Sequence, residues 1–299
     1  MARGRPKGSK NRKTVAKQMA NLQSVNTVIG KKLNDPFKKM TDVQVVELIR
    51  ERFDVMHQMS IGATKGAVRG TIISGAPGVG KSHTVEWVLE QAAHKNPAFK
   101  SYVAKGALTA VNLYKLLWNY RHEGNVIVLD DADSIFFDND GLSLLKAALD
   151  SGARRRICWL SESNALKADG IDTEMDFNGT LIFITNTDFQ RIVDEGKSKL
   201  APHFEAMMNR SIYVDLRLHG RRAVALWVKH IVSKNNILID KFSLTARQQN
   251  ECLDYILKNQ DKLRTLSIRE ALKLAQFMRV DPINWERTAN IVLLRNDLS

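Results

Sequence analysis

One short stretch, GAPGVGKS at residues 75–82, constrains the fold of this chain more than any other feature. It fits the pattern GxxxxGK(S/T) in full and lies between a segment expected to form a strand and one expected to form a helix. Glycines let such a loop turn tightly and direct its N–H groups at phosphate oxygens, and the helix that follows adds its positive dipole end. The stretch therefore predicts a nucleotide-phosphate site, although glycines that serve only a local turn are the alternative.

Each residue of this loop has an expected place in that site. Lys81 would reach the β and γ phosphates, and the Ser82 hydroxyl would bind Mg²⁺. The predicted nucleotide-binding residues are Gly75, Ala76, Pro77, Gly78, Val79, Gly80, Lys81, Ser82 and His83.

Two carboxylates follow a second apolar stretch, VIVL at residues 126–129. A continuous apolar run is typical of a strand buried on both faces, so Asp130 would lie at the carboxyl end of such a strand. There Asp130 would hold Mg²⁺ directly or through water, and Asp131 would polarise the attacking water. The alternative is a pair of acids that cap a turn.

Strand and helix patterns alternate along most of the chain. Strands are expected at 67–75, 99–104, 125–133, 179–186 and 211–218, with a further strand at 156–161; helices are expected at 41–60, 82–95, 109–123 and 141–151. Such alternation predicts a parallel sheet covered on both faces. After about residue 219 the strand patterns stop, and four helices are expected at 220–235, 245–260, 268–279 and 282–294.

The predicted fold is therefore α/β: a P-loop three-layer sandwich with a central parallel sheet, followed by a small all-helical lid domain. The expected boundaries are a basic tail at 1–40, a nucleotide-binding α/β domain at 41–219 and a lid at 220–299. A length of 299 residues and a hydrophobic content of 44% are sufficient for these cores.

The segments GAPGVGKS and VIVLDDADSIF, and their separation, resemble the Walker A and Walker B segments of the AAA+ ATPase superfamily. The resemblance covers roughly residues 45–295 and implies ATP and Mg²⁺ as cofactors. It also implies that Asn186, in LIFITN, senses the γ phosphate. Adenine contacts are expected in the segment 45–68, before the first strand.

Two arginines have family roles by the same resemblance. Arg210, in HFEAMMNRSIYVDL, matches the arginine that is donated to the neighbouring subunit's nucleotide, with Arg191 and Arg217 as rivals. Arg269, in TLSIREALKLA, is similar to a second sensing arginine on the lid, with Arg264 close by. A donated arginine requires neighbouring subunits, so the resemblance implies a ring or helical homo-oligomer, often of six subunits.

One position departs from the family pattern. The family usually has Glu where this chain has Asp131, so the carboxylate would lie about one methylene farther from the attacking water. This departure predicts hydrolysis that is slow or that requires a partner.

The net charge of +13 is concentrated at the N-terminus, where residues 1–34 hold nine Lys or Arg and no acid. Residues 1–20 should be disordered when free, and "Arg3-Gly4-Arg5-Pro6" resembles an AT-hook, which fits a narrow A·T-rich minor groove. Non-specific polyanion binding and a merely solubilising tail are the alternatives. The predicted DNA-binding residues are Arg3, Gly4, Arg5, Pro6, Lys7, Lys10, Arg12 and Lys13.

Other features give weaker expectations. The turn with Lys105 and Gly106 is expected to contact a phosphate backbone or to be a plain turn, and the aromatic residues at 113–120 favour core packing. Cys158 and Cys252 lack CxxC spacing and are expected to be buried reduced thiols, and the seven histidines lack metal-binding spacing such as HExxH.

The chain has no run of 18 apolar residues and no apolar secretion signal after its basic start, so a cytoplasmic protein without a membrane span is expected. The resemblance to the AAA+ superfamily, in a compact form with one ATPase module, a small lid and a basic tail, implies a bacterial or phage-infected cell.

Two functional hypotheses follow. The first is a DNA-associated AAA+ motor or switch in replication, helicase loading, recombination or segregation, with a protein partner such as a helicase; it predicts hydrolysis that DNA stimulates through the tail. The second is a protein-remodelling AAA+ ATPase tethered to DNA by the tail, which predicts hydrolysis that responds to a protein partner and is indifferent to DNA. An ATP-binding scaffold that barely hydrolyses is a third alternative.

Overall fold

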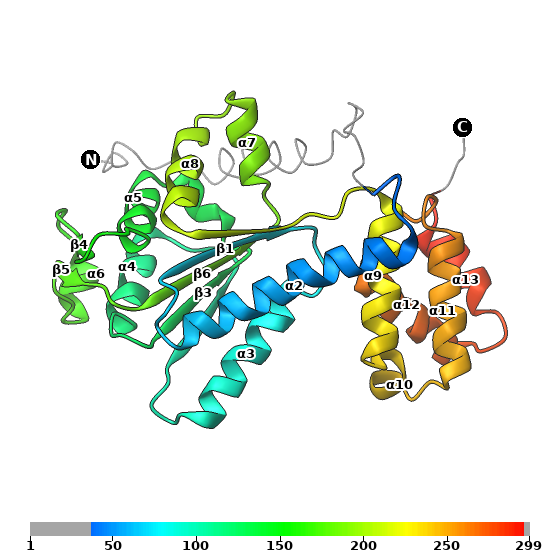
Figure 1. Cartoon of the computed structure of the whole chain (residues 1–299). Coiled ribbons are helices and arrows are strands. Elements are labelled where there is room, and N and C mark those ends of the chain that lie inside the picture. The colour runs from blue at the N-terminus through cyan, green and yellow to red at the C-terminus, as the bar shows by residue number, and fades with distance from the viewer. Residues whose placement is uncertain (1–36, 296–299) are drawn as a thin grey trace, which may run out of the picture. The chain divides into compact units, whose positions relative to one another are not determined.

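The computed structural model describes residues 37–295 of the chain (Figure 1). They form two compact units. The sheet unit contains Met56–Ser74 and Thr84–Val214, and the helical unit contains 37–55, Gly75–His83 and 215–295. The predicted phosphate loop thus belongs to the helical unit, although the strand that leads into it belongs to the sheet unit.

A five-stranded sheet with the order β2-β3-β6-β1-β7 is the centre of the sheet unit (Figure 1). The strands are β1 Gly70–Gly75, β2 Ser101–Lys105, β3 Val126–Asp130, β6 Thr180–Thr185 and β7 Ile212–Leu216. β1 pairs with β6, β6 with β3 and β3 with β2, all in parallel. The register places Ser74 opposite Thr185, and Asp130 opposite Ile184, so β1, β6 and β3 end at one edge of the sheet.

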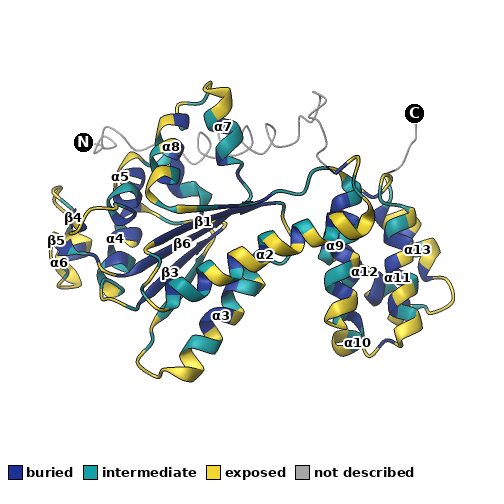
Figure 2. Ribbon diagram, viewed as in Figure 1, coloured by how far each residue is buried: buried dark blue, intermediate teal, exposed yellow. Residues whose placement is uncertain are grey.

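Both faces of this sheet are buried, as Figure 2 shows for the central strands. Ile127 and Leu129 of β3 pack with Phe183 of β6 in a core that includes residues of α4, α5 and α8. The alternate residues Val128 and Ile182, which point to the opposite face, are also buried. The predicted α/β fold with a central parallel sheet is confirmed.

The helices begin and end close to their sequence signals. α2 (Asp42–Thr64) starts after Thr41, whose hydroxyl accepts from the N–H of Gln44 while the Gln44 side chain accepts from the N–H of Thr41. α2 is divided between the two units at Val55 and Met56. The helices that lie wholly or mainly in the sheet unit are α3 Lys81–Lys95, α4 Ala110–Asn119, η1 Asp133–Phe137, α5 Asn139–Ala148, α6 Asn164–Ala168, α7 Phe189–Glu195 and α8 Ala201–Arg210. Of these, η1, α6, α7 and α8 were not predicted.

A small antiparallel pair, β4 (Arg156–Cys158) and β5 (Glu174–Asp176), precedes β6. The expected strand at 156–161 is confirmed over its first half, and β5 was not predicted. Ile157 points into the core, and the alternation of the strand therefore turns Cys158 outward. The prediction that Cys158 is buried is wrong, whereas Cys252 is buried as expected, and burial raises the pKa of its thiol to about 12.

The helical unit is built from α9 Arg221–Lys234, α10 Ile237–Phe242, α11 Ala246–Lys258, α12 Ile268–Val280 and α13 Trp285–Leu293. Apolar residues of all five helices pack in one core. The four expected helices are confirmed, and the short α10 was not predicted. Within residues 37–295, no helix is long and apolar enough to span a membrane.

Candidate nucleotide-binding site

The phosphate loop has the backbone that its glycines allow. Gly78 has φ +68° and Gly80 has φ +107°, a region that residues with a Cβ rarely adopt. A Cβ on Gly78 would also lie 2.7 Å from Cβ of Ser267, closer than two carbons can approach. The helix α3 begins at Lys81, directly after these glycines, so its first N–H groups and its positive dipole end lie at the loop.

Residues from the end of the chain hold two carbonyl groups of this loop within the helical unit. The N–H of Ile268 donates to the carbonyl of Gly78 at 2.9 Å, and the buried indole N–H of Trp227 donates to the carbonyl of Val79 at 3.0 Å. The Trp227 ring in turn packs against Phe53, with centroids 4.5 Å apart. Because a trans peptide directs its N–H opposite to its carbonyl, these bonds turn the N–H groups of Val79 and Gly80 away from Ile268 and Trp227.

Lys81 folds back over the start of the same loop. Its ammonium donates to the carbonyls of Gly75 and Ala76, both at 2.8 Å, and the residue is buried. Ser82 follows in the first turn of α3 and is half-buried, while His83 and Pro77 are exposed. The loop thus holds a cation at its opening, which is the charge that an anionic phosphate requires.

The predicted Mg²⁺ ligand Asp130 is the last residue of β3 and is only 5% exposed. The ammonium of Lys105 lies 3.6 Å from an Asp130 carboxylate oxygen and 2.5 Å from Glu86 of α3. The hydrogen bond to Glu86 raises the pKa of Lys105. The structure therefore places this lysine, a candidate for contact with a phosphate backbone, among the carboxylates of the sheet unit.

Asp131 has φ +52°, a left-handed conformation that is uncommon for residues other than glycine. Its N–H donates to the carbonyl of Ile184 at 3.0 Å, and its carboxylate accepts from the side-chain amide of Asn186 at 2.9 Å. Asp tolerates this conformation because its short polar side chain bonds locally. This backbone conformation thus favours Asp over the Glu that the AAA+ pattern, which the sequence resembles, has at this position.

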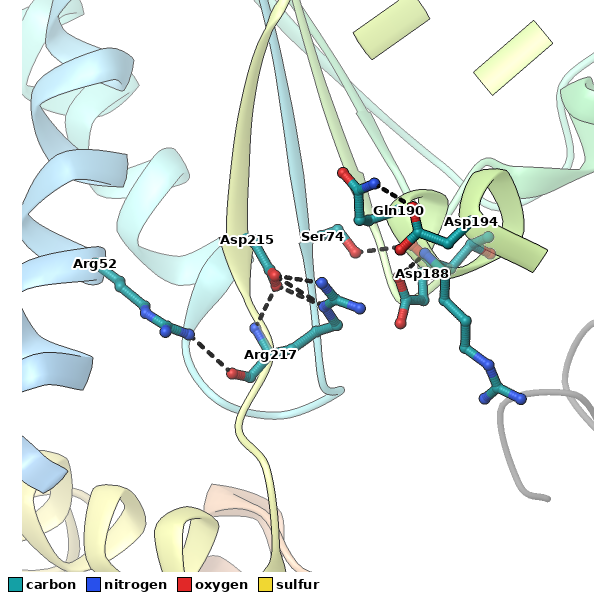
Figure 3. Close-up of polar contacts among 9 residues, drawn as sticks. Arg52, Ser74, Asp188, Gln190, Asp194, Asp215 and Arg217 are labelled. Atoms are coloured by element: carbon teal, nitrogen blue, oxygen red, sulfur yellow. Dashed lines mark hydrogen bonds and ion pairs between the residues drawn. The ribbon is translucent and has the colours of Figure 1, made fainter. Parts of the chain in front are cut away.

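Four residues around this pair were not predicted. The carboxylate of Asp133 accepts from the hydroxyls of Thr185 and Thr187. The hydroxyl of Ser74, labelled in Figure 3, donates to the carbonyl of Thr187 at 2.8 Å. A sequence signal for them existed, because polar residues flank Asn186 in TNT and Asp133 follows Asp131 by two.

The candidate arginines have different surroundings. Arg210 ends α8 and is exposed; its guanidinium donates to the carbonyl of Ala206 and lies 3.6 Å from Asp150. Of its rivals, Arg191 is paired with Glu195 of the same helix.

The rival Arg217 forms an ion pair with Asp215, and the guanidinium of Arg52 donates to the backbone carbonyl of Arg217 (Figure 3). Burial raises the pKa of Asp215, but the bonds from Arg217 outweigh burial and lower it overall.

On the helical unit, α12 brings Arg269 to the phosphate loop. A Cβ on Gly78 would lie 3.9 Å from Cγ of Arg269, which follows the N-cap Ser267 by two residues. Arg264 instead donates its Nε–H to the carbonyl of Leu294. The two candidates for a sensing arginine on the helical unit thus differ: Arg269 lies beside the phosphate loop, whereas Arg264 bonds to the residue that follows α13. The AT-hook-like stretch and the rest of the basic tail to residue 36 lie outside the described residues.

Comparison with known proteins identifies one relative that shows the family of this chain. It is 38% identical over 242 residues to the "Uncharacterized 36.7 kDa protein in nrdC-mobD intergenic region" of Enterobacteria phage T4, which covers 81% of this chain and 73% of the T4 protein. The chain belongs to the family of this T4 protein. No protein-family model matches the chain.

Solved structures give more distant likenesses. AMPPCP-bound DnaA from Aquifex aeolicus is 16% identical, with a TM-score of 0.47 over 81% of this chain, which spans only 65% of that DnaA chain. PCH-2 of C. elegans is 14% identical, with a TM-score of 0.40 over 82% of this chain and 66% of PCH-2. NtrX from Brucella abortus in complex with ATP is 13% identical, with a TM-score of 0.40 over 96% of this chain and 73% of NtrX. These likenesses are too distant to indicate a shared activity.

Proposed function

We propose that this protein is an AAA+ ATPase that binds Mg²⁺ and ATP and hydrolyses the nucleotide. The observation that carries the proposal is the phosphate loop. Its two glycines with positive φ run directly into the N-terminus of α3, and Lys81 folds over its opening. Backbone N–H groups, a helix N-terminus and a lysine are the groups that bind a polyphosphate.

The donor groups of the chain fit Mg²⁺ as well as phosphate. A serine hydroxyl at Ser82 and a carboxylate at Asp130 are hard oxygen ligands, which Mg²⁺ prefers. Bound there, the ion would neutralise charge on the phosphate oxygens. Asp131 would accept a proton from the attacking water while the Asn186 amide orients its carboxylate, and Arg269 beside the loop would add positive charge at the phosphates. The helical segment 220–299 would act as the lid.

We further propose that ATP turnover serves a DNA transaction, such as replication, helicase loading, recombination or segregation, inside a phage-infected cell. The basic tail with its AT-hook-like start supports DNA association, and the T4 relative supports the cellular setting. Homo-oligomers in which Arg210 reaches the neighbouring nucleotide complete this proposal. The second candidate is a partner-activated protein remodeller tethered to DNA by the same tail, favoured by the Asp at position 131.

Steady-state ATP hydrolysis tests the proposal, with and without A·T-rich duplex or single-stranded DNA. The variants are Lys81→Ala, a deletion of residues 1–17, and the control Lys95→Ala at the exposed end of α3. We expect DNA to stimulate hydrolysis, Lys81→Ala to abolish it, the deletion to weaken stimulation and the control to behave as the wild type. A rate that DNA leaves unchanged while ATP still binds would favour the remodeller. Absence of nucleotide binding would refute both.

A further inference from the structure

Asp133, two residues after the predicted catalytic Asp131, ties together both neighbours of Asn186. Its carboxylate oxygens each lie 2.9 Å from the Thr185 hydroxyl, and one of them accepts from the Thr187 hydroxyl at 2.7 Å. Thr185 and Thr187 are themselves buried. An ionised acceptor makes such bonds about twice as strong as neutral ones, so this carboxylate fixes the chain on either side of Asn186.

Two further hydrogen bonds hold the segment 185–187, which contains Asn186. The N–H of Thr187 donates to the Thr185 hydroxyl at 2.9 Å, and the Thr187 carbonyl accepts from Ser74 of β1 at 2.8 Å. The segment 185–187 is thus held by the hydroxyl groups of Thr185 and Thr187 and by the backbone N–H and carbonyl of Thr187. The side-chain amide of Asn186, between the two threonines, donates to the Asp131 carboxylate at 2.9 Å.

We propose that Asp133 is a positioning residue for ATP hydrolysis: through Thr185 and Thr187 it fixes Asn186, and through Asn186 the carboxylate of Asp131. The inference rests on the proposed function. Asp133 contacts the two threonines, and its effect on the reaction passes through Asn186. Removal of the carboxylate takes the acceptor from two buried hydroxyls, which frees the segment 185–187 to shift.

The test compares Asp133→Ala, Asn186→Ala and the double variant, with Asp140→Asn, an exposed carboxylate at the start of α5, as the control. We expect Asp133→Ala to lower kcat for ATP about tenfold or more while KM changes less than about twofold. In the Asn186→Ala background, Asp133→Ala should lower kcat little further, because the Asn186 side chain through which Asp133 acts is already absent. The control should keep wild-type values.

Hydrogen exchange supplies a readout that is independent of hydrolysis. Peptides that cover residues 184–188 should exchange faster in Asp133→Ala than in the wild type and the control, without nucleotide present. If Asp133→Ala does not fold, Asp133→Asn, which keeps the volume and one acceptor oxygen, should show smaller changes in kcat and exchange in the same directions.

The failures are distinguishable. Unchanged exchange at 184–188, an unchanged kcat, or losses that multiply in full in the double variant would overturn the role of Asp133 alone. A wild-type protein that hydrolyses no ATP under any condition would overturn the proposed function, and the role of Asp133 in it.

Discussion

The phosphate loop and the polar edge of the sheet are stabilised in opposite ways. The loop is one contiguous stretch, yet its carbonyl groups are held by Trp227 and Ile268, far away in the sequence. The polar edge brings Asp131 and Asp133 of one segment to Asn186 of another, and bonds between these two segments, with one from Ser74 of β1, hold it. A local motif can thus depend on residues distant in the sequence, while a site assembled from sheet strands is held by bonds between those strands and the segments that follow them.

Substitution of Gly78 by Ala should have the largest effect, because it places a methyl group where the loop packs against Ser267 within the helical unit. Its φ of +68° disfavours any Cβ by about 1–2 kcal/mol, and the clash with Ser267 adds overpacking of about 1–3 kcal/mol. We expect ATP binding to weaken at least about tenfold. Titration calorimetry measures this.

Gly106→Ala is the matched control for Gly78→Ala. Gly106 also has positive φ, at +88°, but a Cβ there would meet nothing within 4 Å. It should show the backbone cost in thermal unfolding with unchanged ATP affinity. Equal losses of affinity in both variants would mean that the contact with Ser267 is irrelevant to the loop.

Trp227→Phe should have the next largest effect, since it removes the indole N–H that holds the Val79 carbonyl. A buried carbonyl without its donor costs about 1–3 kcal/mol, so the helical unit should lose stability and ATP should bind several-fold more weakly. Trp285→Phe, in the same unit and packed on Tyr255, is the control that should lower stability without the loss of affinity. An unchanged affinity in Trp227→Phe, measured by titration, would show that the loop keeps its shape without this anchor.

Asp131→Glu tests whether the polar edge is shaped for Asp. The left-handed backbone at φ +52° should disfavour Glu by about 1 kcal/mol, and the longer side chain should lose its bond from Asn186. We therefore expect kcat to stay equal or fall, and the unfolding midpoint in denaturant to drop slightly. A marked rise in kcat with unchanged stability would show that Asp131 merely weakens an otherwise ordinary AAA+ site.

Much of this fold follows from periodicity and motifs. The sheet strands at residues 179–186 and 125–133 were evident as continuous apolar runs, and four of the five helices after residue 219 as amphipathic repeats. Short elements such as α6 and β5, of 5 and 3 residues, carry too few residues to show a period. The helix α8, with 10 residues, was not predicted; it ends just before β7, and only the pattern of that strand was recognised.

The sequence predicted which residues form the candidate site better than it predicted the hydrogen bonds that hold them in place. The motif at 75–82 identified the loop, but nothing local indicated that Trp227 anchors it, since a tryptophan in an amphipathic helix usually signifies core packing. The threonines beside Asn186 likewise gain their meaning only from the register of β3 and β6. Contacts such as that between Trp227 and Val79, 148 positions apart, depend on tertiary packing, which sequence spacing does not encode.

The smallest expected effect is that of ATP on the rate of thiol labelling, which can be measured at one cysteine in each unit. Exposed Cys158 on β4 should react at once, whereas Cys252, whose pKa burial raises to about 12, should react only when the helical unit opens. Because the loop is held in that unit, ATP with Mg²⁺ should slow labelling of Cys252 and leave Cys158 unchanged. Mass spectrometry over time resolves the two sites, and equal effects of nucleotide on both would contradict the division of roles.

Equilibrium binding of ATP in the presence of Mg²⁺ tests the central claim most directly. Calorimetric titration of the full-length protein, of Lys81→Ala and of the control Lys95→Ala measures it without dependence on turnover. We predict one saturable, Mg²⁺-dependent site per chain in the wild type and the control, and a loss of affinity of at least about tenfold in Lys81→Ala. No binding by the wild type, or equal affinity in Lys81→Ala, would contradict a nucleotide site at this loop.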